Sequence, residues 1–230
     1  MFSRFKQRST ELERLDTGDY SPQEYARWQR EMRVIHRVFG EERAVKNTLV
    51  REVLASGESE VSILDVGAGS GELLRLTGKR LVGKTGFLVG AEINADAARS
   101  IREKGLISLR TDAMNLPFVD DGFDYVFCSL FLHHLDDEPA IKMLREMNRV
   151  ARKKIFVVDL NRSRIAYYFY KVVGGLFLQR FSLEDGALSI LRSRSPEELI
   201  ELAGKAGIKD IRVEHSRANR LILSGQNRER

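Results

Sequence analysis

The chain of 230 residues has a single cysteine, Cys128, and no apolar stretch at its amino terminus. One thiol excludes an intramolecular disulfide and a metal site built from cysteines alone. The opening residues, Met-Phe-Ser-Arg-Phe-Lys-Gln-Arg, lack the apolar core of a signal peptide. Internal repeats and low-complexity tracts are also absent. The sequence therefore predicts a cytoplasmic protein.

A long hydrophobic run is missing as well. Residues 165–178 form an apolar segment of about fourteen residues that Lys171 interrupts, short of the roughly twenty that cross a membrane. The segment lies within an insertion at about 161–194, where Arg162, Arg164 and Arg180 flank it. We favour a lid over a substrate, and core packing or an interfacial membrane helix are the alternatives.

Charge of one sign does not dominate most of the chain. The net charge of +5 and the pI of about 9.4 permit an acidic partner, but Lys and Arg alternate with Asp and Glu along most of the sequence. This mixture argues against a nucleic-acid partner. With 43% hydrophobic and 31% charged residues, the composition is that of a globular protein with a sizeable core.

A glycine-rich turn at residues 67–71 is the most informative stretch. An aliphatic strand at 61–66 precedes it, and helical periodicity resumes at Glu72, so exposed helix amides face a ligand. One residue separates the second and third glycines, whereas two residues separate them in a dinucleotide-binding fingerprint. The residues directly after these glycines are Glu72 and Leu73 rather than Lys-Ser or Lys-Thr, so this turn is not a phosphate-binding P-loop.

Polar residues come at the ends of the next predicted strands. Glu92 ends the strand at 86–92, where doubly wound folds place a carboxylate on ribose hydroxyls. Asp112 follows the strand at 106–109, in position to accept a hydrogen bond from an adenine amino group. The apolar run at 123–132 predicts a fourth strand beside the first, with Ser129 at its end and two histidines beyond.

Strands and helices alternate from residue 61 to 160, where a fifth strand ends. This pattern predicts an α/β fold, a three-layer αβα sandwich around a Rossmann-like, mainly parallel, seven-stranded sheet. Segments 208–215 and 220–224 form its C-terminal antiparallel hairpin. Residues 1–58 are expected to be a helical extension with a partly mobile leader at 1–20, and residues 59–230 the main domain. In the extension, helices are predicted at 22–39 and 41–56, the first with an apolar stripe of Tyr25, Trp28, Met32, Ile35 and Phe39.

The segment Leu-Asp-Val-Gly-Ala-Gly-Ser-Gly resembles the first motif of class I S-adenosylmethionine-dependent methyltransferases, and the later motifs follow at matching spacings. Among the members that act on small molecules, the chain resembles the ubiquinone and menaquinone biosynthesis methyltransferases (methyltransferase type 11). The resemblance implies S-adenosylmethionine as cofactor, no metal, and methyl transfer to a small, largely apolar acceptor such as a phenolic, quinone or polyketide-type metabolite. It also implies these cofactor-binding residues: Asp65, Gly67, Ala68, Gly69, Ser70, Gly71, Glu92, Ile93, Asp112, Ala113 and Ser129.

A hydroxyl acceptor would be helped by a base that titrates near neutral pH, and histidine meets that need. His134 and His133 are the catalytic candidates, although either can instead pack structurally. The alternatives are an RNA methyltransferase, and a non-catalytic cofactor-binding or membrane-peripheral protein. Against RNA, the fourth strand ends Cys128-Ser129-Leu130-Phe131, without the Asn/Asp-Pro-Pro-aromatic motif of amino-directed nucleic-acid methyltransferases. The acceptor atom and the oligomeric state stay open.

Overall fold

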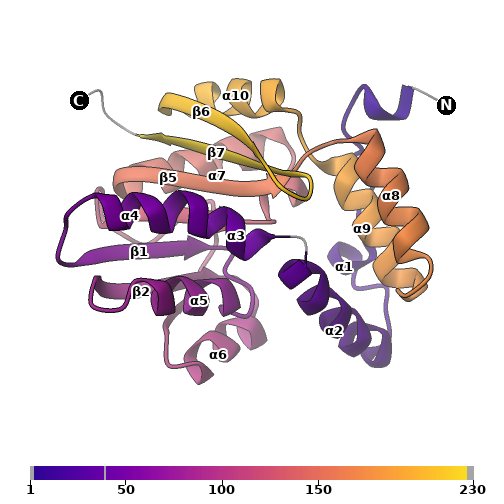
Figure 1. The fold of residues 1–230 in the computed structure, drawn as a ribbon, viewed down its shortest axis with the longest axis horizontal. Helices are drawn as coiled ribbons and strands as arrows, with labels where there is room; N and C mark the ends of the chain where they lie inside the picture. Colours follow the sequence, from indigo (N-terminus) through magenta and orange to yellow (C-terminus); the bar gives the residue numbers. More distant parts are fainter. Residues whose placement is uncertain (1–2, 39, 227–230) are drawn as a thin grey trace.

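The computed structural model describes residues 3–38 and 40–226, and within them seven strands form one sheet in the order β3-β2-β1-β4-β5-β7-β6 (Figure 1). The first five strands are parallel, and β7 runs antiparallel to both β5 and β6. The predicted Rossmann-like sheet and its C-terminal hairpin are thereby confirmed. The order reverses between β1 and β4, which is where ligands bind in such sheets. The strands are β1 (Val61–Val66), β2 (Thr85–Glu92), β3 (Ile107–Arg110), β4 (Phe123–Ser129), β5 (Ala151–Leu160), β6 (Lys209–Ser216) and β7 (Arg220–Gln226).

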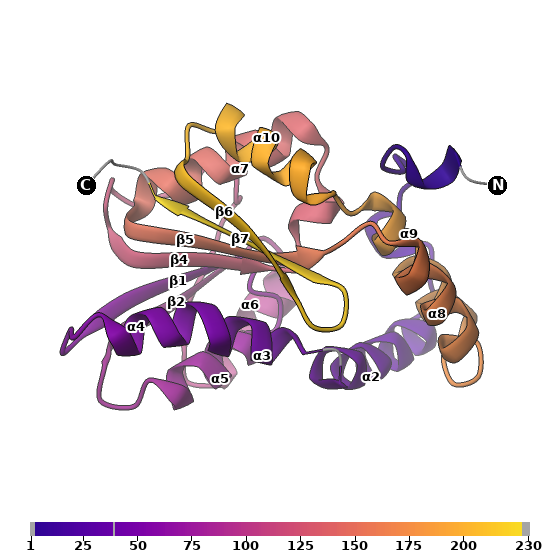
Figure 2. The same cartoon turned by 45° about the horizontal axis from the view of Figure 1, so that its top comes forward.

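Helices cover both faces of the sheet and bury two separate apolar clusters (Figure 2). Successive side chains of a strand point to opposite faces, so Leu64 and Val66 of β1 join one cluster while Val61 and Ile63 join the other. The first cluster includes α7 (Asp137–Val150) and α10 (Pro196–Lys205), and the second includes α3 (Glu41–Val45), η2 (Lys46–Val50), α4 (Arg51–Ala55) and α5 (Glu72–Arg80). Another helix, α6 (Ala95–Glu103), contacts β2 and β3.

The two predicted amino-terminal helices begin where the sequence predicts, but the second is not one continuous α-helix. Helix α2 (Pro22–Val38) begins with the expected capping box, in which Ser21 and Glu24 bond each other's backbone amides. Phe39 of the predicted stripe lies outside the described residues. The helix predicted at 41–56 is divided by the π-helical turn η2 between α3 and α4. The division of the chain at residue 58 stays a prediction.

The insertion forms a helical hairpin beside the carboxyl ends of the parallel strands (Figure 1). Its helix α9 (Arg180–Arg192) packs against α1 (Arg14–Thr17), α2 and the short 3-10 helix η3 (Leu132–His134), whereas α8 (Arg164–Gly174) packs on α9. The leader predicted to be partly mobile is held here: the amides of Arg14 and Leu15 donate to the buried carboxylate of Asp185 at 3.0 and 2.9 Å. We call α1, α2, α8 and α9 the helical cover.

Strand β4 is shorter than the predicted run at 123–132. It ends at Ser129 because Leu130 adopts a positive φ of 50° and turns the chain, with its amide donating to the carbonyl of Val158 at 2.8 Å. Left-handed backbone is uncommon for a residue with a bulky side chain and is often found at functional sites. The turn directs the following residues, which include both histidines, across the sheet edge.

Within the described parts of the chain, none of the helices combines the length and the apolar character needed to span a bilayer.

Candidate active site

The glycine turn after β1 is closed by its neighbours. The amides of Gly67 and Ala68 both donate to the carbonyl of Ala91 in β2, at 2.9 and 3.2 Å. Gly67 has a φ of 70°, and a Cβ added to it would lie 2.7 Å from the ring of Phe131. Only glycine combines this backbone conformation with so little space. The turn therefore lies between β2 and the segment that follows β4.

Glu92 lies against this turn, as its place at the end of β2 predicted. Its Oε2 accepts from the amide of Gly69 at 2.9 Å, and its Oε1 accepts from the amide of Asn94 at 2.9 Å. A carboxylate oxygen offers two lone pairs, so both oxygens can still accept a hydrogen bond from a ligand. Ile93, the next residue, is 62% exposed at the same edge.

Three carboxylates gather where β1 and β2 end. Asp65 is 2% exposed, and its burial, together with Glu41 and Glu92, raises its pKa well above the ordinary value. Ser129, at the end of β4, donates from its Oγ to Oε1 of Glu41 at 2.7 Å. Such a group favours a positively charged ligand, because a nearby cation relieves repulsion among the acids. Sequence reasoning missed Glu41, whose only signal is its place after Gly40.

The other predicted cofactor residues lie around the same edge. Oδ1 of Asp112 accepts from the amide of Met114 at 2.9 Å in a tight turn after β3, and its side chain is exposed. Ala113 beside it is buried. Ser70 is exposed, and its carbonyl accepts from Nζ of Lys104 at 2.8 Å. The carboxyl ends of four strands thus bring the predicted set together.

His133 is held by the carboxylate that ends β5. Its Nδ1 lies 2.6 Å from Oδ1 of Asp159, its amide donates to Oδ2 at 2.9 Å, and both side chains are 4% exposed. Burial disfavours the charged form of Asp159, but His133 outweighs it and holds the pKa of Asp159 below the ordinary value. An ionised carboxylate on Nδ1 fixes the orientation of the imidazole.

His134 is held by the leader instead. Its Nδ1 lies 3.0 Å from Oδ1 of Asp16, whose Oδ2 accepts from the buried Arg192 at 2.5 Å. Burial opposes ionisation of Asp16, yet the hydrogen bond from His134 and the charge of Arg192 lower its pKa to about 2. The two imidazole rings are 4.3 Å apart between centroids.

Three arginines fix the backbone of residues 132–135, which we call the histidine turn. Arg8 donates to the carbonyls of His133 and Leu135 at 3.1 and 3.0 Å, and Arg192 donates to that of His134 at 2.6 Å. Arg194 donates to the carbonyls of Leu132 and Leu135, both at 2.9 Å. Sequence reasoning missed all three, because a backbone carbonyl carries no residue signature.

Glu13 adds a buried acid next to the two histidines. It is 3% exposed, and its Oε1 accepts from Oγ of Ser189 at 2.9 Å. Oxygen and nitrogen atoms of Glu13, His133 and His134 lie within 4.8 Å of one another, a combination that could coordinate a metal ion. The prediction of a metal-free site stays a prediction.

The burial of Glu13 gives a test of leader docking. Burial raises the pKa of Glu13 to about 7. The nearby charges of Asp16 and Asp185 also raise this pKa, whereas His134 and the hydrogen bond from Ser189 lower it. A carboxyl whose pKa is raised on folding stabilises the fold in its protonated form, so this contribution falls as pH rises from about 4.5 to 7. Urea unfolding of the wild type should show a loss of up to about 3 kcal/mol between pH 5 and 8 that Glu13→Gln lacks. Equal pH dependence of both proteins would contradict the prediction.

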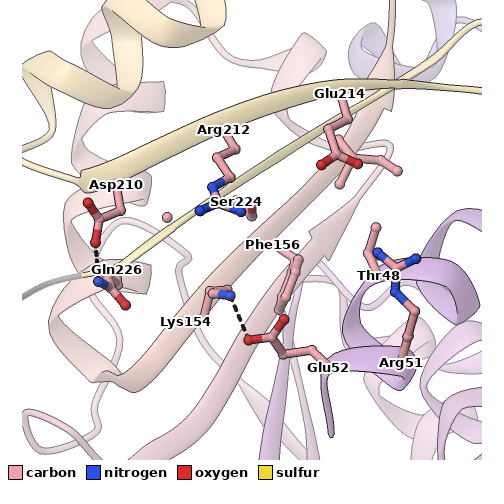
Figure 3. Close-up of a pocket in the computed structure, with 12 residues that line it drawn as sticks. Thr48, Arg51, Glu52, Lys154, Phe156, Asp210, Arg212, Glu214, Ser224 and Gln226 are labelled. Atoms are coloured by element: carbon pink, nitrogen blue, oxygen red, sulfur yellow. Dashed lines mark hydrogen bonds and ion pairs between the residues drawn. The ribbon is translucent and has the colours of Figure 1, made fainter. Parts of the chain in front are cut away.

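A charged cleft of about 190 Å³ lies elsewhere, between α4 and the strands β5, β6 and β7 (Figure 3). Lys154 and Glu52 form an ion pair of 2.6 Å on its floor, and Asp210 pairs with Gln226 at one end. It opens on a face of the sheet, and none of the predicted site residues lines it. It is therefore separate from the site at the strand ends.

Comparisons with known proteins agree with the fold. A family model described as a methyltransferase domain matches residues 63–154. The demethylmenaquinone methyltransferase of Staphylococcus aureus strain Newman is 31% identical over 169 residues, which cover 65% of this chain and 68% of that protein. That of Roseiflexus sp. strain RS-1 is 29% identical over 177 residues, 69% of this chain and 72% of the relative.

Solved structures share the fold at lower sequence identity. The magnesium protoporphyrin IX methyltransferase of Synechocystis PCC 6803 with bound SAH has a TM-score of 0.63 and 18% identity, covering 89% of this chain and 94% of that one. A SAM-dependent methyltransferase from Thermotoga maritima has a TM-score of 0.57 and 19% identity, covering 89% and 100%.

Proposed function

The chain belongs to the class I S-adenosylmethionine-dependent methyltransferases, and on that premise we propose that it methylates a small, largely apolar acceptor held between the strand ends and the helical cover. One observation carries the proposal: the segment with His133 lies between the glycine turn and α9. Phe131, at the start of this segment, contacts the glycine turn, and the histidines that follow pack against α9. The names of the demethylmenaquinone relatives support a quinone-type acceptor. The helical cover contains stacked aromatic rings: Tyr20, just before α2, stacks on Phe181 of α9 with centroids 5.3 Å apart.

S-adenosylmethionine is the methyl donor, and when bound it supplies an electrophilic methyl group on a positively charged sulfur. The residues present fit such a ligand. We propose that Glu92 accepts from the ribose hydroxyls and Asp112 from the adenine amino group, with Ile93 and Ala113 beside the ring. Asp65 and Ser129, the latter through its contact with Glu41, would lie nearest the cationic amino and sulfonium groups. The glycine turn, residues 67–71, leaves room for the ligand to approach the backbone.

The proposed base is His133. Its Nδ1 is bound to Asp159, so its other ring nitrogen can accept a proton from a hydroxyl acceptor while the carboxylate stabilises the imidazolium. His134 is the second candidate, although Asp16 occupies its Nδ1. Because the His133 side chain is 4% exposed, we propose that the leader and α9 act as the lid and move to admit the acceptor.

Calorimetric titration with S-adenosylhomocysteine tests cofactor binding. Wild-type protein should bind, and Glu92→Ala should lose about 1.5 to 3 kcal/mol of binding free energy because hydrogen bonds to a charged group are lost. Glu214→Ala, an exposed acid on β6, is the matched control and should bind as the wild type does. An unchanged affinity of Glu92→Ala would place that carboxylate outside the cofactor site, and no heat at millimolar ligand would remove the proposed site.

The acceptor class needs a separate assay. Protein, S-adenosylmethionine with a deuterated methyl group, and either a demethylmenaquinone analogue or a total RNA extract should yield labelled product from the quinone alone. Label in RNA, together with RNA binding that weakens steeply with salt, would favour the RNA alternative instead.

A further inference from the structure

Helix α8 and the turn after it expose a row of large apolar side chains. Ile165, Phe169 and Val172 are 84, 55 and 69% exposed, and Leu176 and Phe177 are each 74% exposed. The spacing of three to four residues places Ile165, Phe169 and Val172 along one side of α8, and Leu176 and Phe177 follow in the turn. Monomeric proteins rarely leave such a continuous apolar strip in water unless something binds it. We call these five residues the apolar ridge.

The lid and the core do not account for this ridge. The opposite side of α8 is the one that packs inward: Tyr167 is 5% exposed, and Tyr170 donates to the carbonyl of Ser182 at 2.7 Å. It is α9 that packs against the histidine turn, and α8 packs on α9. Figures 1 and 2 both show α8 at the outer margin of the molecule, away from the sheet.

Basic residues surround the ridge. Residues 160–183 contain four bases and no acid, and of these bases Arg164, Lys171 and Arg180 are exposed, whereas the side chain of Arg162 is only 5% exposed and is paired with Glu198. The leader brings two more, because Phe5 packs edge-on against Tyr167 with centroids 5.4 Å apart and Arg4 donates to the hydroxyl of Tyr167 at 3.1 Å. Lys6 follows and is exposed. The nearest acid along the chain, Glu184, is already paired with Arg180.

We propose that the apolar ridge and its basic border bind the surface of a lipid bilayer that contains anionic lipid. An apolar strip that enters the headgroup region, with cations beside it, is the pattern of interfacial helices. A second copy of the chain fits less well, since pairing two ridges would bring like charges together. The eleven residues of α8 are too few to cross the membrane, so binding would be peripheral.

Vesicle flotation tests this proposal with a matched pair of variants. Wild-type protein should float with phosphatidylcholine vesicles containing phosphatidylglycerol, and less with phosphatidylcholine alone. Val172→Asp/Phe177→Asp should lower the ratio of vesicle-bound to free protein at least about tenfold, because two apolar side chains that would enter the bilayer are lost. The control, Val82→Asp/Val119→Asp, makes the same change at apolar side chains 82 and 75% exposed elsewhere, and should float as the wild type does.

Two results would overturn the proposal. One is equal flotation of the ridge variant and the control. The other is a wild-type dimer in sedimentation velocity that the ridge variant dissociates, which would assign the ridge to a second copy. If the ridge variant binds S-adenosylhomocysteine as the wild type does in calorimetry, the variant is folded and its cofactor site is intact. The inference does not depend on the proposed acceptor site.

Discussion

Replacing His133 with alanine is expected to lower kcat for a hydroxyl-bearing acceptor by about 10² to 10⁴, the usual contribution of a positioned general base. Affinity for S-adenosylhomocysteine should stay unchanged, because the imidazole is bound to Asp159 rather than to the residues proposed for the cofactor. The loss should shrink as pH rises, since hydroxide and a more ionised acceptor replace the missing base. Steady-state rates across pH measure this.

His215→Ala is the matched control, because His215 is an exposed histidine on β6 without an assigned role. Asp159→Asn should give a smaller loss than His133→Ala if the carboxylate only orients the ring and stabilises its charge. If His133→Ala retains full kcat while His134→Ala loses it, the two histidines exchange roles. Full activity of both variants would mean that the acceptor needs no base from this turn.

Replacing Gly67 with alanine is expected to destabilise the protein by about 2 to 5 kcal/mol and to abolish most cofactor binding. Left-handed backbone costs an L-residue about 1 to 2 kcal/mol, and overpacking adds about 1 to 3. The added Cβ would lie 2.7 Å from the ring of Phe131, so the segment that leads to the histidines must also move. Urea unfolding and calorimetric titration measure the two effects.

Gly83→Ala separates these contributions. Gly83 has a φ of 78°, close to that of Gly67, but nothing lies within 4 Å of an added Cβ. This control should therefore lose only the backbone part and keep cofactor affinity. If both substitutions destabilise the protein equally and leave cofactor binding normal, Phe131 moves aside freely. The close contact between Gly67 and Phe131 would then have no role in function.

The sequence predicted the sheet well because its signals are local. The glycine turn and the aliphatic run before it predicted β1, and strand alternation predicted the parallel order and the hairpin. The polar residues at strand ends, such as Glu92, were found because parallel strands bring those ends to one edge. The extent of the run at 123–132 was wrong, because the positive φ of Leu130 is not visible in an apolar pattern.

The parts of the site that sequence reasoning missed depend on contacts between distant segments. Asp16 meets His134 across 118 positions, and Glu13 meets Ser189 across 176. Glu41 reaches Ser129 across 88. Each of these acids lies in a polar or helical stretch that looks solvated when it is considered alone. Only the packing of the leader and of α3 against the strand ends shows that Glu13 and Glu41 are buried and that Asp16 is paired.

The place of β7 in the sheet has a consequence for synthesis on the ribosome. Strand β5 pairs with β7, which follows α8, α9, α10 and β6 in the sequence, so one edge of β5 has no partner until β7 has been made. The strand is apolar on both faces, where Val157 and Val158 join the two clusters. An unpaired strand edge favours association between chains. The nascent protein is thus most open to aggregation between the synthesis of β5 and that of β7, and protection by a chaperone would matter most in that interval.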